Sequence, residues 1–347
     1  MRTALTVSLL AAATLAACVP VLPESEPVQV VDSGAPVSGK GGSGGGGAGD
    51  ASVPSGPFTL VASAGRPRNL AFDGNVYWVN RDTLTLMSIP EDGRAAPSQR
   101  ARVKSTDAWV AAYNGYLYWS DGANGAATNI YVLPAGGTQP TLIVSGTDAI
   151  SQIAVSSAGE GVFWVTRGGA VMRLASLDGT PAMLASGLGS GGALAVDAGS
   201  VYWTGGDSVI KIGIAGGGAA VFASPAAGTS IAVDATNLYW VNPMWTHVLS
   251  LDGLTPDGPI MKVGLDGKNA RMAFNYGYSI RGTCLATGGA RVYYGDAGGT
   301  AHIVSPADGF EWTFGPMGAP AMSIVVGASS VFWSVDAPVD SIVGAPR

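Results

Sequence analysis

The sequence predicts an all-β protein that folds as a seven-bladed β-propeller, and three observations support this prediction. A pattern of an apolar strand, a turn and an aromatic pair occurs seven times between Asn69 and Asp336. The pattern recurs about every 42 residues, within the roughly 40–50 residues that are typical of propeller blades. The two ends of the chain also supply complementary parts of one repeat. A fixed period of this kind indicates a ring of equivalent units.

Each repeat is expected to contain four short strands. The first is apolar with a small residue at its second position, and the second carries the aromatic pair, as in LAVDAGSVYWTGG from Leu194 to Gly206. A third strand ends in a glycine turn such as Asp178-Gly179, because glycine accepts positive φ without steric cost. We expect the aromatic pairs to fill the wedges between neighbouring blades; they are Tyr77-Trp78, Tyr118-Trp119, Phe163-Trp164, Tyr202-Trp203, Tyr239-Trp240, Tyr293-Tyr294 and Phe332-Trp333.

The chain termini indicate how the ring closes. The last repeat runs through a third strand at residues 341–345 and stops at Arg347. The missing fourth strand is expected at residues 58–63, ahead of the first repeat. An N-terminal strand that completes the last blade, in a 3+1 arrangement, removes an exposed sheet edge. We therefore place one propeller at residues 57–347.

Residues 1–18 have the features of an export signal. Arg2 precedes an apolar run at residues 4–13, which is too short to span a membrane as a helix. The segment Leu15-Ala16-Ala17-Cys18 resembles the lipobox of bacterial lipoproteins, in which cleavage leaves the cysteine as a lipid-bearing N-terminus. The resemblance implies a lipid anchor on Cys18, and Val19 in place of an aspartate favours the outer membrane. The alternative is an ordinary signal peptide in which Cys18 is incidental.

Residues 19–56 are expected to form a disordered tether. The segment is rich in Pro, Gly and Ser and includes a glycine-rich run at residues 39–47. It cannot bury enough apolar surface to offset the entropy lost on ordering. A flexible chain of about 38 residues has an end-to-end distance of roughly 35 Å. The propeller would therefore be held just off the membrane.

Composition excludes several kinds of partner. The net charge is −6 and the pI is near 4.8, whereas nucleic-acid binding requires a basic surface. No basic run suits anionic lipid, so membrane contact is expected through the anchor. With Cys18 lipidated, Cys284 is the one remaining cysteine, so no intramolecular disulfide is expected and Cys284 is predicted to be a buried packing thiol. We expect a monomer.

The candidate binding residues are expected on one face of the ring, here called the loop face. It is formed by the loops that enter first strands and the loops between second and third strands, and loops on rigid scaffolds often carry function. Trp109 lies outside the aromatic-pair register and is either an exposed recognition anchor or a core side chain. An insertion at residues 243–259 contains Trp245, His247, Asp252 and Asp257. The shorter loops supply Arg81, Asp82, Asp121, Asp207, Asp296 and Asp336.

The sequence offers no catalytic pattern in a suitable context. HExxH, P-loop and CxxC motifs do not occur, and the GxSxG spacing is met only at residues 41–45, in the glycine run of the expected tether. The two histidines, His247 and His302, lack metal-ligand spacing. The loop-face aspartates could together bind a hard cation such as calcium or magnesium through oxygen ligands. The other interpretation is that they solvate the loops. No further cofactor is expected.

The VYWT and LYWVN segments, with the preceding LAVD and IAVD, resemble propellers of the YWTD and NHL-repeat type over residues 57–347. The resemblance implies an interaction module for a protein, peptide or glycan ligand, although a minority of such propellers are enzymes of the streptogramin lyase type. YWTD rings usually have six blades, and after a Tyr-Trp pair the aspartate of that motif is kept only at Asp121; Asp296 holds the same position after Tyr293-Tyr294. We therefore expect a non-catalytic binding propeller displayed on the cell envelope. The alternative is a metal-assisted lyase or hydrolase that uses loop-face carboxylates and His247.

Overall fold

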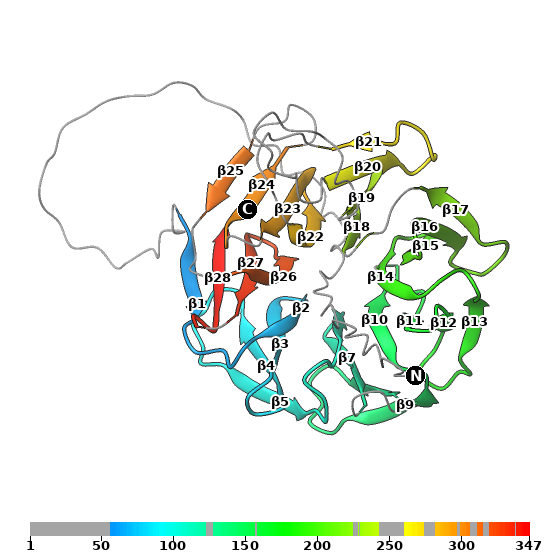
Figure 1. The fold of residues 1–347 in the computed structure, drawn as a ribbon. Coiled ribbons are helices and arrows are strands. Elements are labelled where there is room, and N and C mark those ends of the chain that lie inside the picture. The colour runs from blue at the N-terminus through cyan, green and yellow to red at the C-terminus, as the bar shows by residue number, and fades with distance from the viewer. Residues whose placement is uncertain are drawn as a thin grey trace, which may run out of the picture.

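The ring of seven blades predicted from the repeat is confirmed in a computed structural model. The structure describes residues 56–122, 128–156, 158–224, 228, 230–242, 260–273, 282–296, 299–305, 311–314, 319–336 and 338–347. In this part of the chain the regular elements are all strands, β1 to β28, which form seven antiparallel sheets of four strands each. The sheets stand around a common centre like the blades of a propeller (Figure 1).

The strands of each blade follow one another from the centre of the ring outward. Blade 1 consists of β2 (Arg68–Phe72), β3 (Asn75–Asn80), β4 (Thr85–Pro90) and β5 (Ser98–Arg102). Blade 2 consists of β6 (Val110–Tyr113), β7 (Tyr116–Asp121), β8 (Thr128–Leu133) and β9 (Thr141–Thr147). Blade 3 consists of β10 (Ile150–Val155), β11 (Val162–Thr166), β12 (Val171–Leu174) and β13 (Ala182–Ala185).

The same order continues through the second half of the ring. Blade 4 consists of β14 (Gly191–Val196), β15 (Ser200–Gly205), β16 (Ser208–Gly213) and β17 (Ala220–Ala223). Blade 5 consists of β18 (Ile231–Val233), β19 (Asn237–Val241), β20 (Ile260–Gly264) and β21 (Arg271–Met272). Blade 6 consists of β22 (Gly282–Gly288), β23 (Arg291–Asp296), β24 (Ala301–Val304) and β25 (Glu311–Phe314). Blade 7 consists of β26 (Ala321–Val326), β27 (Ser330–Val335), β28 (Ser341–Pro346) and β1 (Phe58–Val61).

The ring is closed by strands from both ends of the propeller. β1 pairs antiparallel with β28, with Phe58 opposite Gly344, and so completes blade 7 in the predicted 3+1 arrangement. The blue β1 lies beside the red β28 in Figure 1. The innermost strands contact one another in turn around the ring, from β2 through β6, β10, β14, β18, β22 and β26 back to β2. Pairing β1 with β28 covers an edge that would otherwise be open for association.

The aromatic pairs fill the space between blades, as the sequence predicts. Side chains alternate between the two faces of a strand, so the two rings of one pair point into opposite interfaces. Tyr77 of blade 1 therefore packs in the same cluster as Trp119 of blade 2. Tyr118 in turn packs with Trp164 of blade 3. Burial in this position raises the pKa of Tyr118 to about 12. The hydrophobic core is thus divided among the interfaces between neighbouring blades.

The first strands supply the small residues that the centre of the ring requires. Every residue at the second position of the apolar pattern is almost fully buried; these residues are Ala71, Ala111, Ala154, Ala195, Ala232, Ala286 and Val325. Cys284, in β22, is also buried and is not in a disulfide. The predicted packing role of this cysteine is confirmed.

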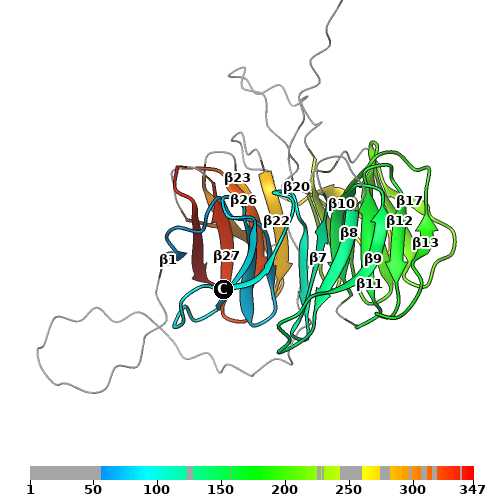
Figure 2. The same ribbon diagram turned by 90° about the horizontal axis from the view of Figure 1, so that it is seen from below.

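The ring has two faces, between which the strands run (Figure 2). The loop face carries the connections from second to third strands and the connections into first strands. The opposite face, here called the hairpin face, carries the first-to-second hairpins and the third-to-fourth turns. The predicted leader with Cys18, the predicted tether up to residue 55 and the insertion at residues 243–259 lie outside the described residues. No helix in the described part of the chain is long and apolar enough to cross a membrane.

Candidate functional site

Polar side chains at the loop-face ends of the innermost strands join neighbouring blades. Asn69 Nδ2 donates a hydrogen bond of 2.7 Å to the carbonyl oxygen of Ala108 in the next blade. The backbone N–H of Leu70 donates to Ser323 Oγ at 2.9 Å, which joins blade 1 to blade 7. The pairing register shifts at the start of both β2 and β26, and such bulges re-aim side chains. These residues therefore hold the ring together where the loops begin.

A partly buried ion pair links blade 1 to blade 7 on the loop face. Arg68 Nη2 lies 2.9 Å from Asp336 Oδ2, and the two side chains are 13% and 23% exposed. Burial lowers the pKa of Arg68, Asp336 opposes this effect, and the nearby positive charge of Arg81 adds to it. The guanidinium remains a cation at neutral pH. Asp336 is therefore the compensating charge for a largely buried cation.

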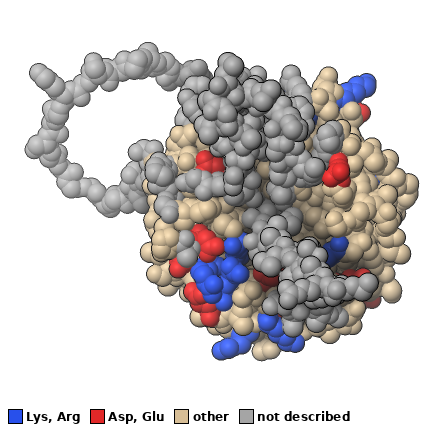
Figure 3. Space-filling model, viewed as in Figure 1, with Lys and Arg blue, Asp and Glu red and all other residues tan. Residues whose placement is uncertain are grey.

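A second ion pair on the same face is exposed. Arg66 Nε lies 2.6 Å from Asp82 Oδ1, with side chains 43% and 48% exposed. Exposed pairs of this kind contribute little to stability, because water and salt screen them. In Figure 3, which views the loop face, acidic and basic side chains gather at the lower left of the ring. Arg66, Arg68, Arg81, Asp82 and Asp336 together form what we call the loop-face cluster.

Asp121 has a structural role in the loop face. Its side chain is buried, and Oδ1 accepts a hydrogen bond of 2.6 Å from the backbone N–H of Lys104. Burial raises the pKa of Asp121, while the hydrogen bonds from the backbone N–H groups of Lys104 and Ser105 act in the opposite direction. The interpretation of this aspartate as a solvated loop residue is therefore wrong. It binds the backbone that enters blade 2.

Asp296 is joined to His302 in blade 6. Asp296 Oδ2 lies 3.0 Å from His302 Nε2, and Oδ1 accepts a hydrogen bond of 2.7 Å from the backbone N–H of Thr300. The His302 ring is buried and stacks on Tyr294 with centroids 4.4 Å apart. Tyr294 and His302 are directly paired across their strands, whereas Cys284 is opposite Gly295, one position away. Strand alternation therefore places Cys284 and His302 on opposite faces of the sheet, which separates the thiol from the imidazole.

Trp109 and Asp207 differ in exposure. Trp109 is only 7% exposed and packs in the cluster between blades 2 and 3. Its backbone N–H donates to Ser120 Oγ at 3.0 Å. Trp109 is thus a core side chain, and the expectation of an exposed anchor is wrong. Asp207 is exposed in the turn that follows β15. Trp245, His247, Asp252 and Asp257 lie outside the described residues.

The described aspartates do not converge on one point. Within the part of the chain that the structure describes, no group of three or more His, Cys, Asp or Glu side chains could hold a metal ion. Asp82 and Asp336 instead bind arginines, Asp121 binds backbone N–H groups, and Asp296 binds a histidine. The chemistry available to the loop-face cluster is the recognition of charged and hydrogen-bonding groups.

Sequence reasoning missed the basic partners of these acids. Arg66 and Arg68 were not among the candidates, although each binds a candidate aspartate. Arg68 and Asp336 are 268 positions apart in sequence. The predicted closure places blades 1 and 7 side by side. Opposite charges in the loops of these two blades are therefore the sequence signal that predicts an ion pair between them.

Comparison with known proteins identifies the fold and no closer relationship. No family model matches the chain, and no curated protein sequence matches it. Similar solved structures include U3-55K, with a TM-score of 0.64 and 12% identity over 85% of this chain and 99% of that one. Virginiamycin B lyase from Staphylococcus aureus has a TM-score of 0.62 and 12% identity over 84% and 98% of the two chains.

A third similar structure comes from a nidogen/laminin complex. Its TM-score is 0.51, with 18% identity over 66% of this chain and 89% of that one. The TM-scores show that the chains share a fold, and identities this low carry no functional assignment. The fold shared with these chains is the propeller.

Proposed function

We propose that this chain is an exported, lipid-anchored propeller that acts as a non-catalytic binding module at the bacterial outer membrane. The lipid on Cys18 would attach it to the membrane, and residues 19–56 would hold the ring off the surface. The ring would then present its faces to a protein, peptide or glycan ligand. The similar solved structures include a propeller in a nidogen/laminin complex, which is consistent with an interaction role.

The observation that carries this proposal is that three of the described loop-face acids, Asp121, Asp296 and Asp336, are bound to structural partners. Catalysis by a general acid or base requires a group that is free to exchange a proton with a substrate. Asp121 and Asp296 are instead bound to backbone N–H groups, and Asp336 compensates the charge of Arg68. A rigid ring with different polar loops from blade to blade suits recognition.

The lipid anchor can be tested in cells. The native chain should incorporate an alkyne-labelled fatty acid and sediment with the outer membrane. A Cys18→Ser variant should lose the label and leave the outer-membrane fraction. A Cys284→Ser variant is the matched control and should keep both properties. Labelling that survives Cys18→Ser would contradict the anchor.

The binding role can be tested with the full chain purified in a neutral detergent. Arrays of glycans and peptides should reveal a ligand that binds saturably, equally well with or without a chelator, and is recovered unchanged. The alternative, a metal-assisted lyase or hydrolase, requires the opposite result. Conversion of a ligand that is lost with His247→Ala or with the chelator would refute the non-catalytic proposal.

A further inference from the structure

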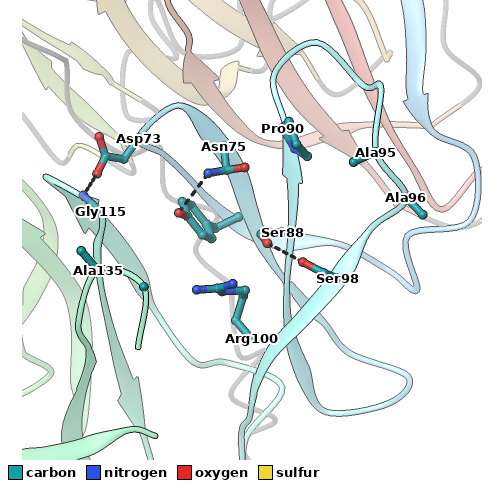
Figure 4. A pocket seen from close by; sticks show the side chains of 12 residues that line it. Asp73, Asn75, Ser88, Pro90, Ala95, Ala96, Ser98, Arg100, Gly115 and Ala135 are labelled. Carbon is teal, nitrogen blue, oxygen red and sulfur yellow. Dashed lines mark hydrogen bonds between the residues drawn. The ribbon is translucent and has the colours of Figure 1, made fainter. Parts of the chain in front are cut away.

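A hollow opens on the hairpin face between blades 1 and 2, away from the candidate residues of the loop face. Its volume is about 380 Å³, within the range of roughly 300–1,000 Å³ for small-molecule sites. Figure 4 shows the side chains around it. The lining residues that matter here are Asp73, Asn75, Tyr77, Ser88, Ser98 and Arg100.

One cause of the hollow is a small residue where other blades carry a large one. Ser88 is paired with Tyr77, the first ring of the aromatic pair in blade 1. The corresponding residue of blade 4 is Lys211, whose Nζ lies 5.2 Å from the centroid of the Tyr202 ring. The other residues at this position are Val132, Arg173, Lys262, Ile303 and Gly344. At Gly344 the space is taken by Phe58, whose ring centroid lies 6.2 Å from that of Phe332.

The second cause is Arg100, which departs from the packing pattern of the repeat. In blades 1 to 4 the pairing of third and fourth strands shifts register at the same place, which leaves one extra residue on the fourth strand. In blades 2, 3 and 4 this residue is Ile143, Leu184 or Phe222, and each packs against the core. Blade 1 has Arg100 there. Departures of this kind from a local rule are expected at functional sites.

Arg100 offers unused hydrogen-bond donors to the hollow. Its Nε is buried, and among the described residues it has no hydrogen-bond partner. In Figure 4 the guanidinium extends into the hollow, with Asn75 above it and Ser88 and Ser98 to one side. Burial raises the pKa of Tyr77, and the positive charge of Arg100 has a smaller, opposing effect. Nε itself has almost no accessible surface, so the donors that an acceptor on a ligand would reach are the terminal Nη groups of the guanidinium.

The remaining polar groups around the hollow include both donors and acceptors. Asn75 Nδ2 lies 3.4 Å from the Tyr77 hydroxyl, and the hydroxyls of Ser88 and Ser98 are 3.1 Å apart. Asp73 accepts a hydrogen bond from the backbone N–H of Gly115 through Oδ2. Side-chain hydroxyls can donate or accept. The hollow therefore combines one cation with several groups that match sugar hydroxyls.

We propose that this hollow binds a carboxylate-bearing sugar, with the carboxylate on Arg100 and the ring hydroxyls on Asn75, Ser88 and Asp73. Arginine matches a carboxylate in a bidentate geometry. Asp73 at the rim would repel a phosphate dianion more strongly than a single carboxylate. The hydroxyls of a sugar ring can each donate and accept, which suits the hydroxyls and the amide of this lining. This inference rests on the proposed binding function and names its ligand class.

The neighbouring interface supplies an internal comparison. A hollow of about 220 Å³ lies at the equivalent place between blades 2 and 3, beside Tyr116, Tyr118 and Leu177. Ile143 occupies the bulge position there and packs against the core. This second hollow is smaller than the usual range for ligand sites, and none of the described residues that line it is an arginine or a lysine. We expect no acidic sugar to bind there.

The test is a titration of the full chain, in neutral detergent, with galacturonate and its trimer against galactose and its trimer. Binding is measured by saturation-transfer NMR and calorimetry. We expect the uronate trimer to bind saturably and the neutral trimer to bind at least about tenfold more weakly, as for loss of one charge-assisted contact. Absence of detectable binding by the uronates would overturn the proposal.

Three variants locate the binding. Arg100→Ala should weaken binding of the uronate trimer at least about tenfold. Ser88→Ile should abolish binding of the uronate trimer, because the isoleucine side chain would fill the hollow. Blade 6 carries isoleucine at this position. Arg94→Ala removes an equal charge from an exposed site on the same face and should leave binding unchanged. A thermal melt confirms that each variant is folded.

Other outcomes are decisive as well. Uronate binding that is insensitive to both Arg100→Ala and Ser88→Ile would place the ligand elsewhere and overturn the assignment. Arg100-dependent binding of a glutamate tripeptide, without binding of uronates, would show a peptide site and reject the sugar. If array ligands still bind the chain while uronates do not, this inference fails and the proposed binding function stands.

Discussion

The two faces of the ring use charged side chains in different ways. On the loop face Arg66 and Arg68 each bind an aspartate, and Asp121 binds backbone N–H groups. On the hairpin face Arg100 extends into a hollow and has no carboxylate partner among the described residues. The Nε atoms of Arg68 and Arg81 on the loop face lack a hydrogen-bond partner in the described structure, as the Nε of Arg100 does. The loop-face pairs therefore contribute mainly to the stability of the ring, and Arg100 is the better candidate for recognition because it lines a hollow.

The largest effect is expected for Asp336→Ala on the loop face. The change leaves Arg68, which is 13% exposed, without the carboxylate at 2.9 Å, and close to the like charge of Arg81. Removing one partner of a largely buried pair costs about 3 kcal/mol of unfolding free energy. Urea denaturation measures the change. A loss below about 0.5 kcal/mol would show that the pair does not hold blades 1 and 7 together.

The second-largest loss of unfolding free energy is expected for Asp121→Ala. The substitution leaves the backbone N–H groups of Lys104 and Ser105 without an acceptor, which costs about 2 kcal/mol. Urea denaturation at pH 7 again gives the value. Asp121→Asn is the matched variant, because an amide oxygen can accept the same hydrogen bonds without a buried charge. Equal losses for both variants would contradict this role of the acceptor oxygen.

The pH dependence of the free energy of unfolding tests the direction in which the pKa of Asp121 is shifted. Burial raises the pKa of Asp121 above its usual value of 3.8, so the unfolded chain loses this proton first as the pH rises. The contribution of Asp121 to stability is therefore greatest below pH 3.8 and falls as the pH rises through the folded-state pKa. Relative to the native chain, Asp121→Asn should gain stability between pH 3 and pH 7. A relative loss over that range would show that the pKa is lowered instead.

A smaller effect is expected for Arg66→Ala. The Arg66–Asp82 pair is exposed on both sides, so solvent and salt screen it and its loss should lower the free energy of unfolding much less than Asp336→Ala or Asp121→Ala does. The measurement is urea denaturation at low and high salt, with the difference between native chain and variant disappearing at high salt. A loss as large as that of Asp336→Ala would remove the distinction between the two pairs.

The smallest effect on stability is expected for Arg100→Ala on the hairpin face. Because no described residue pairs with Nε, the variant should unfold within about 0.3 kcal/mol of the native chain or become slightly more stable. The same variant should lose uronate binding. A loss of about 2 kcal/mol would instead place Arg100 among the structural charges, as on the loop face.

The sequence predicts the architecture well because each of the seven repeats has to bury the same kinds of side chain in the same positions. The aromatic pairs predict the interfaces between blades, and the phase of the termini predicts the pairing of β1 with β28. Each of these signals is a regular pattern, and each pattern reflects a shared requirement for burial.

The candidate site is less predictable because it depends on contacts between distant residues. Trp109 lies outside the aromatic-pair register, and its burial depends on the packing of blade 2 against blade 3. The hydrogen bonds of Asp121 come from a loop that precedes it by 17 residues. Arg100 is visible as a departure only after the strand registers align it with Ile143, Leu184 and Phe222. The spacing of residues in the sequence does not give the pairing of third and fourth strands, so it does not reveal this departure.

The most direct test of the contrast between the faces is a thermal melt of the full chain with calcium, magnesium, zinc or a chelator. If the loop-face acids are structural, none of the ions should raise the melting temperature above that in chelator. A specific ion at a hundredfold excess over its Kd would add about 2.7 kcal/mol to the stability of the folded state. A clear rise with one ion would contradict the account and favour a metal-dependent site on the loop face.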